Sequence, residues 1–193
     1  MNIYDKAIEL LALQDEDAEI IEIFKTGSQL FRDNPRDIDY VIVCNNYEQR
    51  RRRILFEENN IKYDFLFLSP EAIQAQLDFN NLYYLSSNNK LFNYLFIIKE
   101  TVYGNYNVNW NMLNYKNDYL SYAKEKYTET VGKAKIKKSF GKSFVHYYII
   151  LKMFENNSTE ITNQMRDDIQ KLYSGSDEAT PIIDYVDDKI KQV

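Results

Sequence analysis

The chain has 193 residues, of which 45% are hydrophobic and 27% charged, and its formal net charge is −5 at pH 7. This composition is typical of a folded globular protein with one domain or a small two-part domain, and it excludes a disordered chain. The acidic net charge excludes a protein that binds nucleic acid through its overall charge, while local basic patches stay open.

Cysteine usage and hydropathy predict a cytoplasmic protein. Cys44 is the single cysteine, so no intramolecular disulfide can form, and we recognise no signal sequence. The longest apolar runs, such as residues 147–151, are too short to cross a bilayer. We therefore expect no membrane partner.

The first half of the chain predicts a mixture of helices and strands. Apolar residues recur at helical spacing near the start, and later runs rich in Ile, Val and Phe have strand composition. The expected elements are a helix over 3–11, a strand over 19–24, a short helix from Ser28, a strand over 37–44, a helix over 47–58, a strand over 61–68, a helix that begins at Ser69-Pro70, and a short strand and turn over 101–105.

The second half reads as helices only. We expect helices over 115–127, 134–155, 160–173 and 181–191, with Ser158 or Thr159 and then Thr180 as caps. The change of character falls near residue 108. The sequence therefore predicts an α/β (α+β) fold, with a mixed-sheet domain over 1–108 and a helical bundle domain over 109–193.

Two acids open the predicted strand over 37–44. Side chains on a strand alternate between faces, so Asp37 and Asp39 project from the same face. Two neighbouring carboxylates need a cation, and hard oxygen ligands suit Mg²⁺, above all when phosphates complete its coordination. Asp64 lies in the apolar run 61–68 and is either an edge residue that faces water or a third member of this cluster.

Gly27-Ser28, Asp37-x-Asp39 and Asp64 on a separate strand together resemble the DNA polymerase beta superfamily of nucleotidyltransferases. The resemblance covers roughly the first half of the chain. It is much more specific than a lone Asp-x-Asp, because the features agree in order, spacing and predicted element.

The chain departs from the family pattern on both sides of the Gly-Ser pair. Small members often have an aromatic residue before the glycine and an arginine after the serine, where this chain has Thr26 and Gln29. Lys25, Arg32 and Arg36 are the candidates to replace the missing triphosphate contacts.

The resemblance implies a role for each matched residue. Asp37 and Asp39 would hold two Mg²⁺ ions, with Mn²⁺ as the alternative metal, and Asp64 would bind the catalytic ion beside the acceptor hydroxyl. Gly27 and Ser28 would contact the β- and γ-phosphates at a turn into a helix. Attack at the α-phosphorus would release pyrophosphate.

Two basic segments lie outside this pattern. The first is Arg50 to Arg53, which we interpret as a solvated helix surface paired with glutamates rather than a polyanion contact. The second is a helix face of the second half, formed by Lys135, Lys138, Lys142 and His146. On that face Lys142 is the candidate for a phosphate or base contact. His146 is more typical of a core position than of a functional one.

We therefore expect Mg²⁺-dependent transfer of a nucleoside monophosphate from an NTP, with ATP as the expected donor, bound between the two halves. The acceptor stays open among an RNA 3′ end, a protein side chain and a small molecule, and so does the oligomeric state. The alternative function is a non-catalytic nucleotide-sensing or partner-binding module, such as a toxin–antitoxin component, with the same fold.

Overall fold

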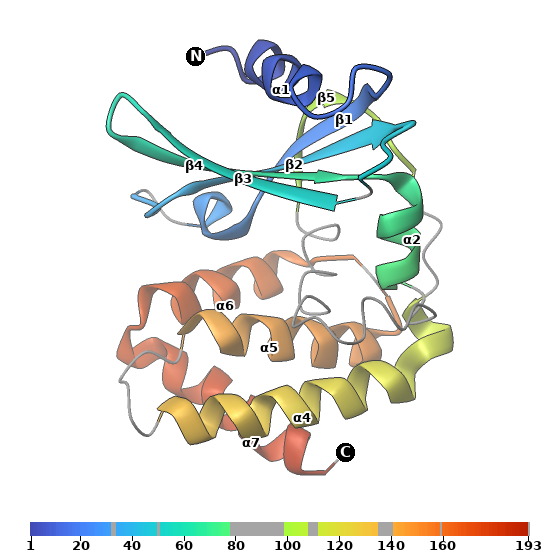
Figure 1. Cartoon of the computed structure of the whole chain (residues 1–193). Coiled ribbons are helices and arrows are strands. Elements are labelled where there is room, and N and C mark those ends of the chain that lie inside the picture. Colours follow the sequence, from blue (N-terminus) through green and yellow to red (C-terminus); the bar gives the residue numbers. More distant parts are fainter. Residues whose placement is uncertain are drawn as a thin grey trace. The chain divides into compact units, whose positions relative to one another are not determined.

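A computed structural model describes residues 1–31, 34–49, 51–77, 99–107, 112–134, 141–158 and 160–192 (Figure 1). The chain divides into two units, Met1–Trp110 and Asn111–Val193, and each is described here by itself. The predicted boundary near residue 108 lies outside the described residues.

The first unit contains a five-stranded mixed sheet with the strand order β3-β4-β2-β1-β5. Its elements are α1 (Ile3–Ala12), β1 (Glu19–Thr26), the short 3₁₀ helix η1 (Gly27–Leu30), β2 (Ile38–Asn45), β3 (Arg51–Glu58), β4 (Ile61–Leu68), α2 (Pro70–Leu77) and β5 (Glu100–Gly104). Strands β2 and β4 run parallel, and the other neighbouring strands are antiparallel. The predicted mixed sheet is confirmed.

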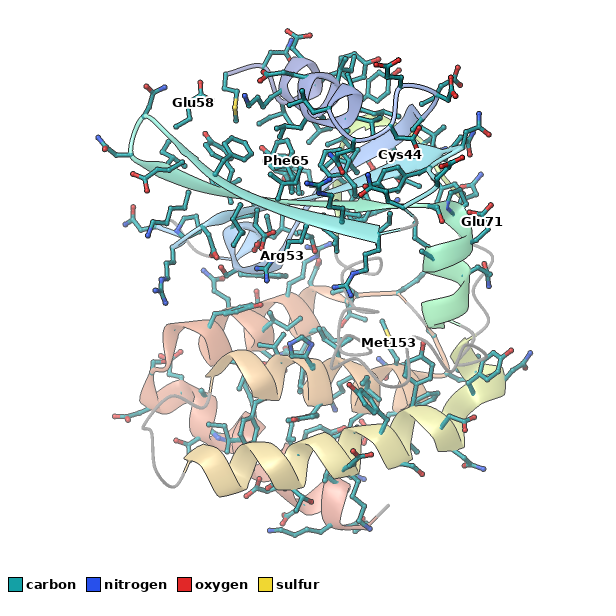
Figure 2. The ribbon with its side chains drawn as sticks, in the orientation of Figure 1. Cys44, Arg53, Glu58, Phe65, Glu71 and Met153 are labelled. Carbon is teal, nitrogen blue, oxygen red and sulfur yellow. The ribbon has the colours of Figure 1, made fainter. Side chains whose placement is uncertain are left out.

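The two faces of this sheet differ because side chains alternate along each strand. Tyr40 and Ile42 of β2 and Phe65 of β4 pack with Ala7 and Leu11 of α1 in one apolar core. Figure 2 shows Phe65 on the side of the sheet that faces α1 and Arg53 on the opposite side. The polar residues of interest therefore project from the face that α1 does not cover.

The predicted helix over 47–58 is wrong. Residues Arg51–Glu58 form β3, which pairs antiparallel with β4. The two strands are joined through Asn59 and Asn60, which have positive φ angles of 52° and 62°. Asparagine tolerates this conformation, and two such residues in succession form a tight hairpin turn. This turn and the antiparallel pairing with β4 decide for a strand.

The interpretation of Arg50 to Arg53 as a helix surface paired with glutamates is wrong for the same reason. Arg51, Arg52 and Arg53 lie in β3, and Arg53 forms an ion pair with Asp64 rather than with a glutamate. Arg50 lies outside the described residues.

The second unit is helical, as predicted. Its elements are the 3₁₀ helix η3 (Met112–Tyr115), α4 (Lys116–Ala134), α5 (Gly141–Asn156), α6 (Asn163–Ser174), the 3₁₀ helix η4 (Asp177–Ala179) and α7 (Thr180–Lys191). The other three α-helices all pack against α5. Within the described ranges, no helix is long and apolar enough to cross a membrane.

The helix caps differ from those expected. Thr162 caps α6, because its hydroxyl accepts a hydrogen bond from the backbone N–H of Met165 at 3.2 Å. Ser158 accepts instead from the N–H of Glu160, ahead of the helix, and Thr159 lies outside the described residues. Thr180 is the first residue of α7 and forms no side-chain cap. By contrast, Ser69 caps α2 as expected, through the N–H of Ala72 at 3.1 Å.

Candidate functional site

The register of the sheet brings Asp39 and Asp64 side by side. The two residues are paired on the parallel strands β2 and β4. Thr26 of β1 pairs with Asp39 on one side, and Leu55 of β3 pairs with Asp64 on the other. Paired residues on neighbouring strands project from the same face of a sheet. The two carboxylates therefore share the face that α1 leaves uncovered.

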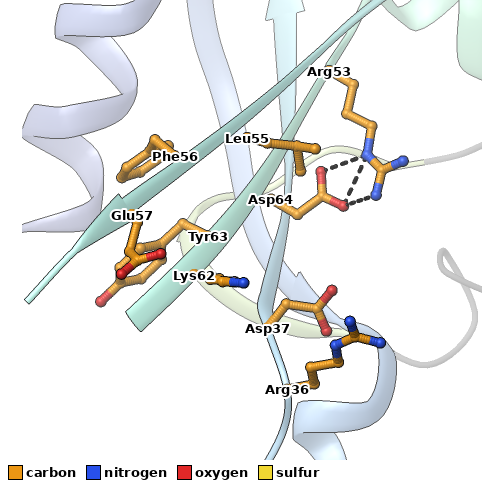
Figure 3. Close-up of a pocket in the computed structure, with 9 residues that line it drawn as sticks. All are labelled: Arg36, Asp37, Arg53, Leu55, Phe56, Glu57, Lys62, Tyr63 and Asp64. Carbon is orange, nitrogen blue, oxygen red and sulfur yellow. Dashed lines mark hydrogen bonds and ion pairs between the residues drawn. The ribbon is translucent and has the colours of Figure 1, made fainter. Parts of the chain in front are cut away.

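Asp37 and Asp64 line one cavity, which we call the acid cavity (Figure 3). The cavity has a volume of about 410 Å³ and lies along β3, the first part of β4 and the residues before β2. Its charged lining residues are Arg36, Asp37, Arg53, Glu57, Lys62 and Asp64, and Leu55, Phe56 and Tyr63 form its apolar wall. Three of its side chains are cationic and three are acidic, so the acid cavity can contact both a cation and an anion.

Gly27 lies directly against Asp39. Strand β1 ends at Thr26, and Gly27 has a φ of 77°, which favours glycine. A Cβ built on Gly27 would collide with Oδ2 of Asp39. The turn can therefore approach the Asp39 carboxylate only because residue 27 has no side chain.

Gln29 links the same turn to β2 through hydrogen bonds. Its side-chain amide donates to the carbonyl of Thr26 at 2.9 Å and to the carbonyl of Asp39. Ser28 is buried in this turn, with 7% of its surface exposed. Gln29 thus has a structural role at the position where the family resemblance leads one to expect an arginine.

Arg53 is a site residue that the sequence interpretation missed. Its Nε donates to Oδ1 of Asp64 at 2.8 Å and to Oδ2 at 2.9 Å, and its Nη2 forms a further bond with Oδ2. Strand β3 pairs Arg53 with Leu66, two residues from Asp64 along β4, so the guanidinium reaches the carboxylate diagonally. Leu55 is the residue that pairs with Asp64, and Arg53 lies two positions before it. This spacing could have identified Arg53 as a neighbour of Asp64, but only once residues 51–58 are recognised as a strand.

The pKa of Arg53 is raised, and the causes connect it with all three acids. The hydrogen bond to Asp64 raises the pKa most, partial burial opposes the rise, and the negative charges of Asp64, Asp39 and Asp37 add to it. The three carboxylates therefore lie close enough to act on one guanidinium.

The acids fit a divalent ion by chemistry, but Arg53 already neutralises one of them. Carboxylate oxygens are the ligands that Mg²⁺ prefers. Both oxygens of Asp64, however, accept hydrogen bonds from Arg53. Among the residues that the structure describes, no group of three or more His, Cys, Asp or Glu side chains is arranged to hold a metal ion.

The other basic candidates lie in different surroundings. Arg36 is exposed and lines the acid cavity. Lys25 forms an ion pair with Glu100 of β5 at 3.1 Å. Lys142 lies in α5, but its side chain is outside the described part of the chain, as are Arg32, Lys135 and Lys138. His146 is 8% exposed and therefore buried in the second unit.

Comparisons with known proteins find a likeness in structure and none in sequence. No protein-family model matches the sequence, and no curated protein matches it. Among solved structures, the chain is similar to a nucleotidyltransferase-like protein from Exiguobacterium sibiricum, with a TM-score of 0.39 and 10% identity over 88% of this chain. The match covers 64% of the length of that protein. A likeness of this size carries no argument about function, which must rest on the residues themselves.

Proposed function

We propose that the protein transfers a nucleoside monophosphate from an NTP, with ATP as the expected donor, to a nucleophile of an acceptor molecule. One observation carries this proposal: Asp39 and Asp64 are neighbours on one face of the sheet, and their charges and that of Asp37 act on the same guanidinium. A cluster of carboxylates on a half-buried surface favours cations strongly. With Mg²⁺ and the phosphates of a nucleotide, such a cluster is the usual protein contribution to phosphoryl-group chemistry.

Each of the three acids has its own proposed role, which depends on its position. Asp37 and Asp39 are the proposed ligands of both ions, and Asp64 is the proposed ligand on the acceptor side, because the acid cavity continues from Asp64 along β3. When bound, two Mg²⁺ ions stabilise the attacking and the leaving oxygen of an in-line displacement, and Mn²⁺ is the alternative. Asp64 then lies where the acceptor hydroxyl loses its proton.

The phosphates of the donor would lie near the turn between β1 and η1. Gly27 allows the turn to approach Asp39, and the Ser28 hydroxyl is the proposed phosphate contact in that turn. Arg36 adds an exposed positive charge at the acid cavity. Lys142 stays a proposed phosphate or base contact from α5.

The proposed reaction breaks a phosphoanhydride bond of the NTP and forms a phosphoester bond with the acceptor. The acceptor oxygen forms a bond to the α-phosphorus while the bond from that phosphorus to the bridging oxygen of the β-phosphate breaks. Pyrophosphate leaves, and the acceptor keeps the nucleoside monophosphate. An RNA 3′ end, a protein side chain and a small molecule all stay open as the acceptor.

Transfer of label from ATP tests the proposal. The protein is incubated with α-³²P-labelled ATP, Mg²⁺ and a cell lysate, and the label is followed into RNA, protein and small molecules. We expect one of these fractions to acquire label, which also identifies the acceptor class. ATP binding without any transfer would contradict the proposal and favour the non-catalytic nucleotide-sensing module.

Asp39→Asn is the matched test of the carboxylate cluster. We expect it to lower the rate of transfer by at least about 100-fold, because removing one carboxylate removes a ligand shared by the ions. Asp188→Asn, an exposed acid in α7, makes the same chemical change away from the site and should transfer normally. Circular dichroism checks that both variants are folded. Normal transfer by folded Asp39→Asn would overturn the assignment of the site.

A further inference from the structure

Arg53 and Asp64 form an ion pair whose two partners have unequal freedom. The side chain of Asp64 is 10% exposed, whereas that of Arg53 is 56% exposed. Asp64 is fixed within the central part of the sheet, and Arg53 reaches it from the edge strand β3. Leaving the buried Asp64 carboxylate without a cation would be costly, but a metal ion that takes the place of Arg53 supplies the same kind of charge, and the exposed arginine side chain is free to turn towards water. Arg53 is therefore the partner that can leave.

The pair conflicts with the proposed role of Asp64. Each Asp64 oxygen already accepts from the guanidinium, and a divalent ion on the same carboxylate would lie next to that positive charge. An ion that binds Asp64 must therefore displace at least part of the Arg53 contact.

Arg53 lines the acid cavity together with a second arginine, Arg36. Figure 3 shows Arg53 beside Asp64 and Arg36 beside Asp37, so each arginine lies at one of the two aspartates that line the cavity. Guanidinium groups bind phosphate oxygens with paired hydrogen bonds, as they bind carboxylates. The α-phosphate of a nucleotide, which the acceptor would attack beside Asp64, is thus a suitable second partner for Arg53.

We propose that Arg53 is a positioning residue that exchanges partners: it holds Asp64 before the divalent ions bind, and it contacts the α-phosphate of the nucleotide once the ions and the nucleotide have bound. This inference rests on the proposed function, because it requires Asp64 to bind an ion. It predicts that Arg53 opposes the binding of the ion alone and favours the binding of the ion with nucleotide.

The exchange is tested by two affinities, one for Mn²⁺ and one for an ATP analogue, which we expect Arg53→Gln to change in opposite directions. Mn²⁺ is titrated into the protein by calorimetry, first alone and then with a non-hydrolysable ATP analogue. We expect Arg53→Gln to bind Mn²⁺ alone roughly three- to tenfold more tightly than the wild type, the range expected for loss of a competing charge-assisted pair. In the presence of Mn²⁺ the same variant should bind the ATP analogue about tenfold more weakly, because it lacks a phosphate contact.

Two control variants distinguish the exchange of partners from the mere loss of a positive charge. Arg52→Gln removes a neighbouring exposed arginine from the opposite face of β3, and it should leave both affinities unchanged. Arg36→Gln removes the same charge from the acid cavity beside Asp37, so in the titration of Mn²⁺ alone, before nucleotide is added, it measures the effect of the lost charge. We expect Arg36→Gln to tighten Mn²⁺ binding less than Arg53→Gln does.

The outcomes are distinguishable from a failure of the proposed function. Equal Mn²⁺ affinities of Arg53→Gln and the wild type, with binding lost in Asp39→Asn, would overturn the exchange and leave the proposed function intact. Equal effects of Arg36→Gln and Arg53→Gln on the affinity for Mn²⁺ alone would also overturn the exchange. A wild type that binds neither Mn²⁺ nor the ATP analogue would overturn both. If Arg53→Gln does not fold, Arg53→Lys, which keeps the charge but not the two-oxygen contact, should show the same two shifts at smaller size.

Discussion

Gly27 and Asp39 are coupled at the scale of single residues. Gly27 has a positive φ, and the position of a Cβ there is taken by the Asp39 carboxylate. The backbone of Asp39 is held in place, because Gln29 donates a hydrogen bond to its carbonyl. The close approach of the turn to the carboxylate therefore depends on the absence of a single side chain.

Gly27→Ala tests this coupling. We expect it to lower the free energy of unfolding by about 2–4 kcal/mol, because alanine is strained at this φ and its Cβ meets Asp39. Transfer activity should also fall, since the Asp39 carboxylate must move. Urea unfolding followed by circular dichroism measures the first effect and the labelling assay measures the second.

Gly175 provides the matched control for Gly27. It follows α6 with a φ of 66°, and in the described part of the chain, its two sequence neighbours apart, no atom lies within 4 Å of a Cβ built there. Gly175→Ala should lower the free energy of unfolding by only about 1 kcal/mol and leave transfer unchanged. Equal losses of stability in the two variants would contradict a steric role for the Asp39 contact.

At the scale of elements, strand pairing and caps decide the boundaries. The hairpin of β3 and β4 brings Arg53 over Asp64, and its turn depends on two asparagines with positive φ. The start of α6 depends on Thr162, whose hydroxyl satisfies one of the backbone N–H groups that the first turn leaves without a helical acceptor. Local polar contacts of this kind set where an element begins.

Thr162→Ala tests the cap. We expect a loss of about 1 kcal/mol in the free energy of unfolding, because the N–H of Met165 loses its side-chain acceptor. Ser158→Ala removes a hydroxyl that serves a turn outside the helix, so its loss should be within about 0.5 kcal/mol. Urea unfolding of the two variants makes the comparison. A larger loss in Ser158→Ala would show that the expected cap, rather than the observed one, stabilises α6.

At the scale of the whole molecule, both units bury tyrosine hydroxyls. In the first unit, burial raises the pKa of Tyr47 to about 12. In the second unit, burial and then the hydrogen bond to Asp168 raise the pKa of Tyr148, and burial and the hydrogen bond to Asp187 raise that of Tyr127. The ionised form of each tyrosine is therefore less favourable in the folded chain than in the unfolded one.

The consequence is a loss of stability at high pH. An unfolded tyrosine ionises near pH 10, so the contribution of these groups is fully present below about pH 10 and is lost as the pH rises towards their folded values. We expect the free energy of unfolding to fall by roughly 1–3 kcal/mol between pH 9 and pH 11.5, measured by urea unfolding at constant ionic strength.

Tyr148→Phe identifies one source of this pH dependence. The variant should be less stable at pH 8, because it loses the hydrogen bond to Asp168, but its stability should decline less steeply above pH 10. A stability that stays constant up to pH 11.5 in the wild type would contradict the role of the buried tyrosines.

The sequence by itself determined what depends on neighbours along the chain. Periods of apolar residues located α1, the strands β1, β2 and β4 and the four long helices of the second unit, because helix and strand repeat every few residues. Asp37 and Asp39 are two residues apart, and this spacing alone predicts that they share a face of the sheet. The Gly-Ser pair marked the turn after β1 because few residues tolerate that backbone.

Only the tertiary structure decided which distant residues meet. The pairing of β2 with β4 puts Asp64 next to Asp39, and the pairing of β3 with β4 puts Arg53 over Asp64. A helical interpretation of residues 47–58 hid Arg53, because a short amphipathic run fits both periods until its partner strand is known. The register between strands is set by the hairpin turn and by burial of one face against α1, and neither is written in the local pattern of β3.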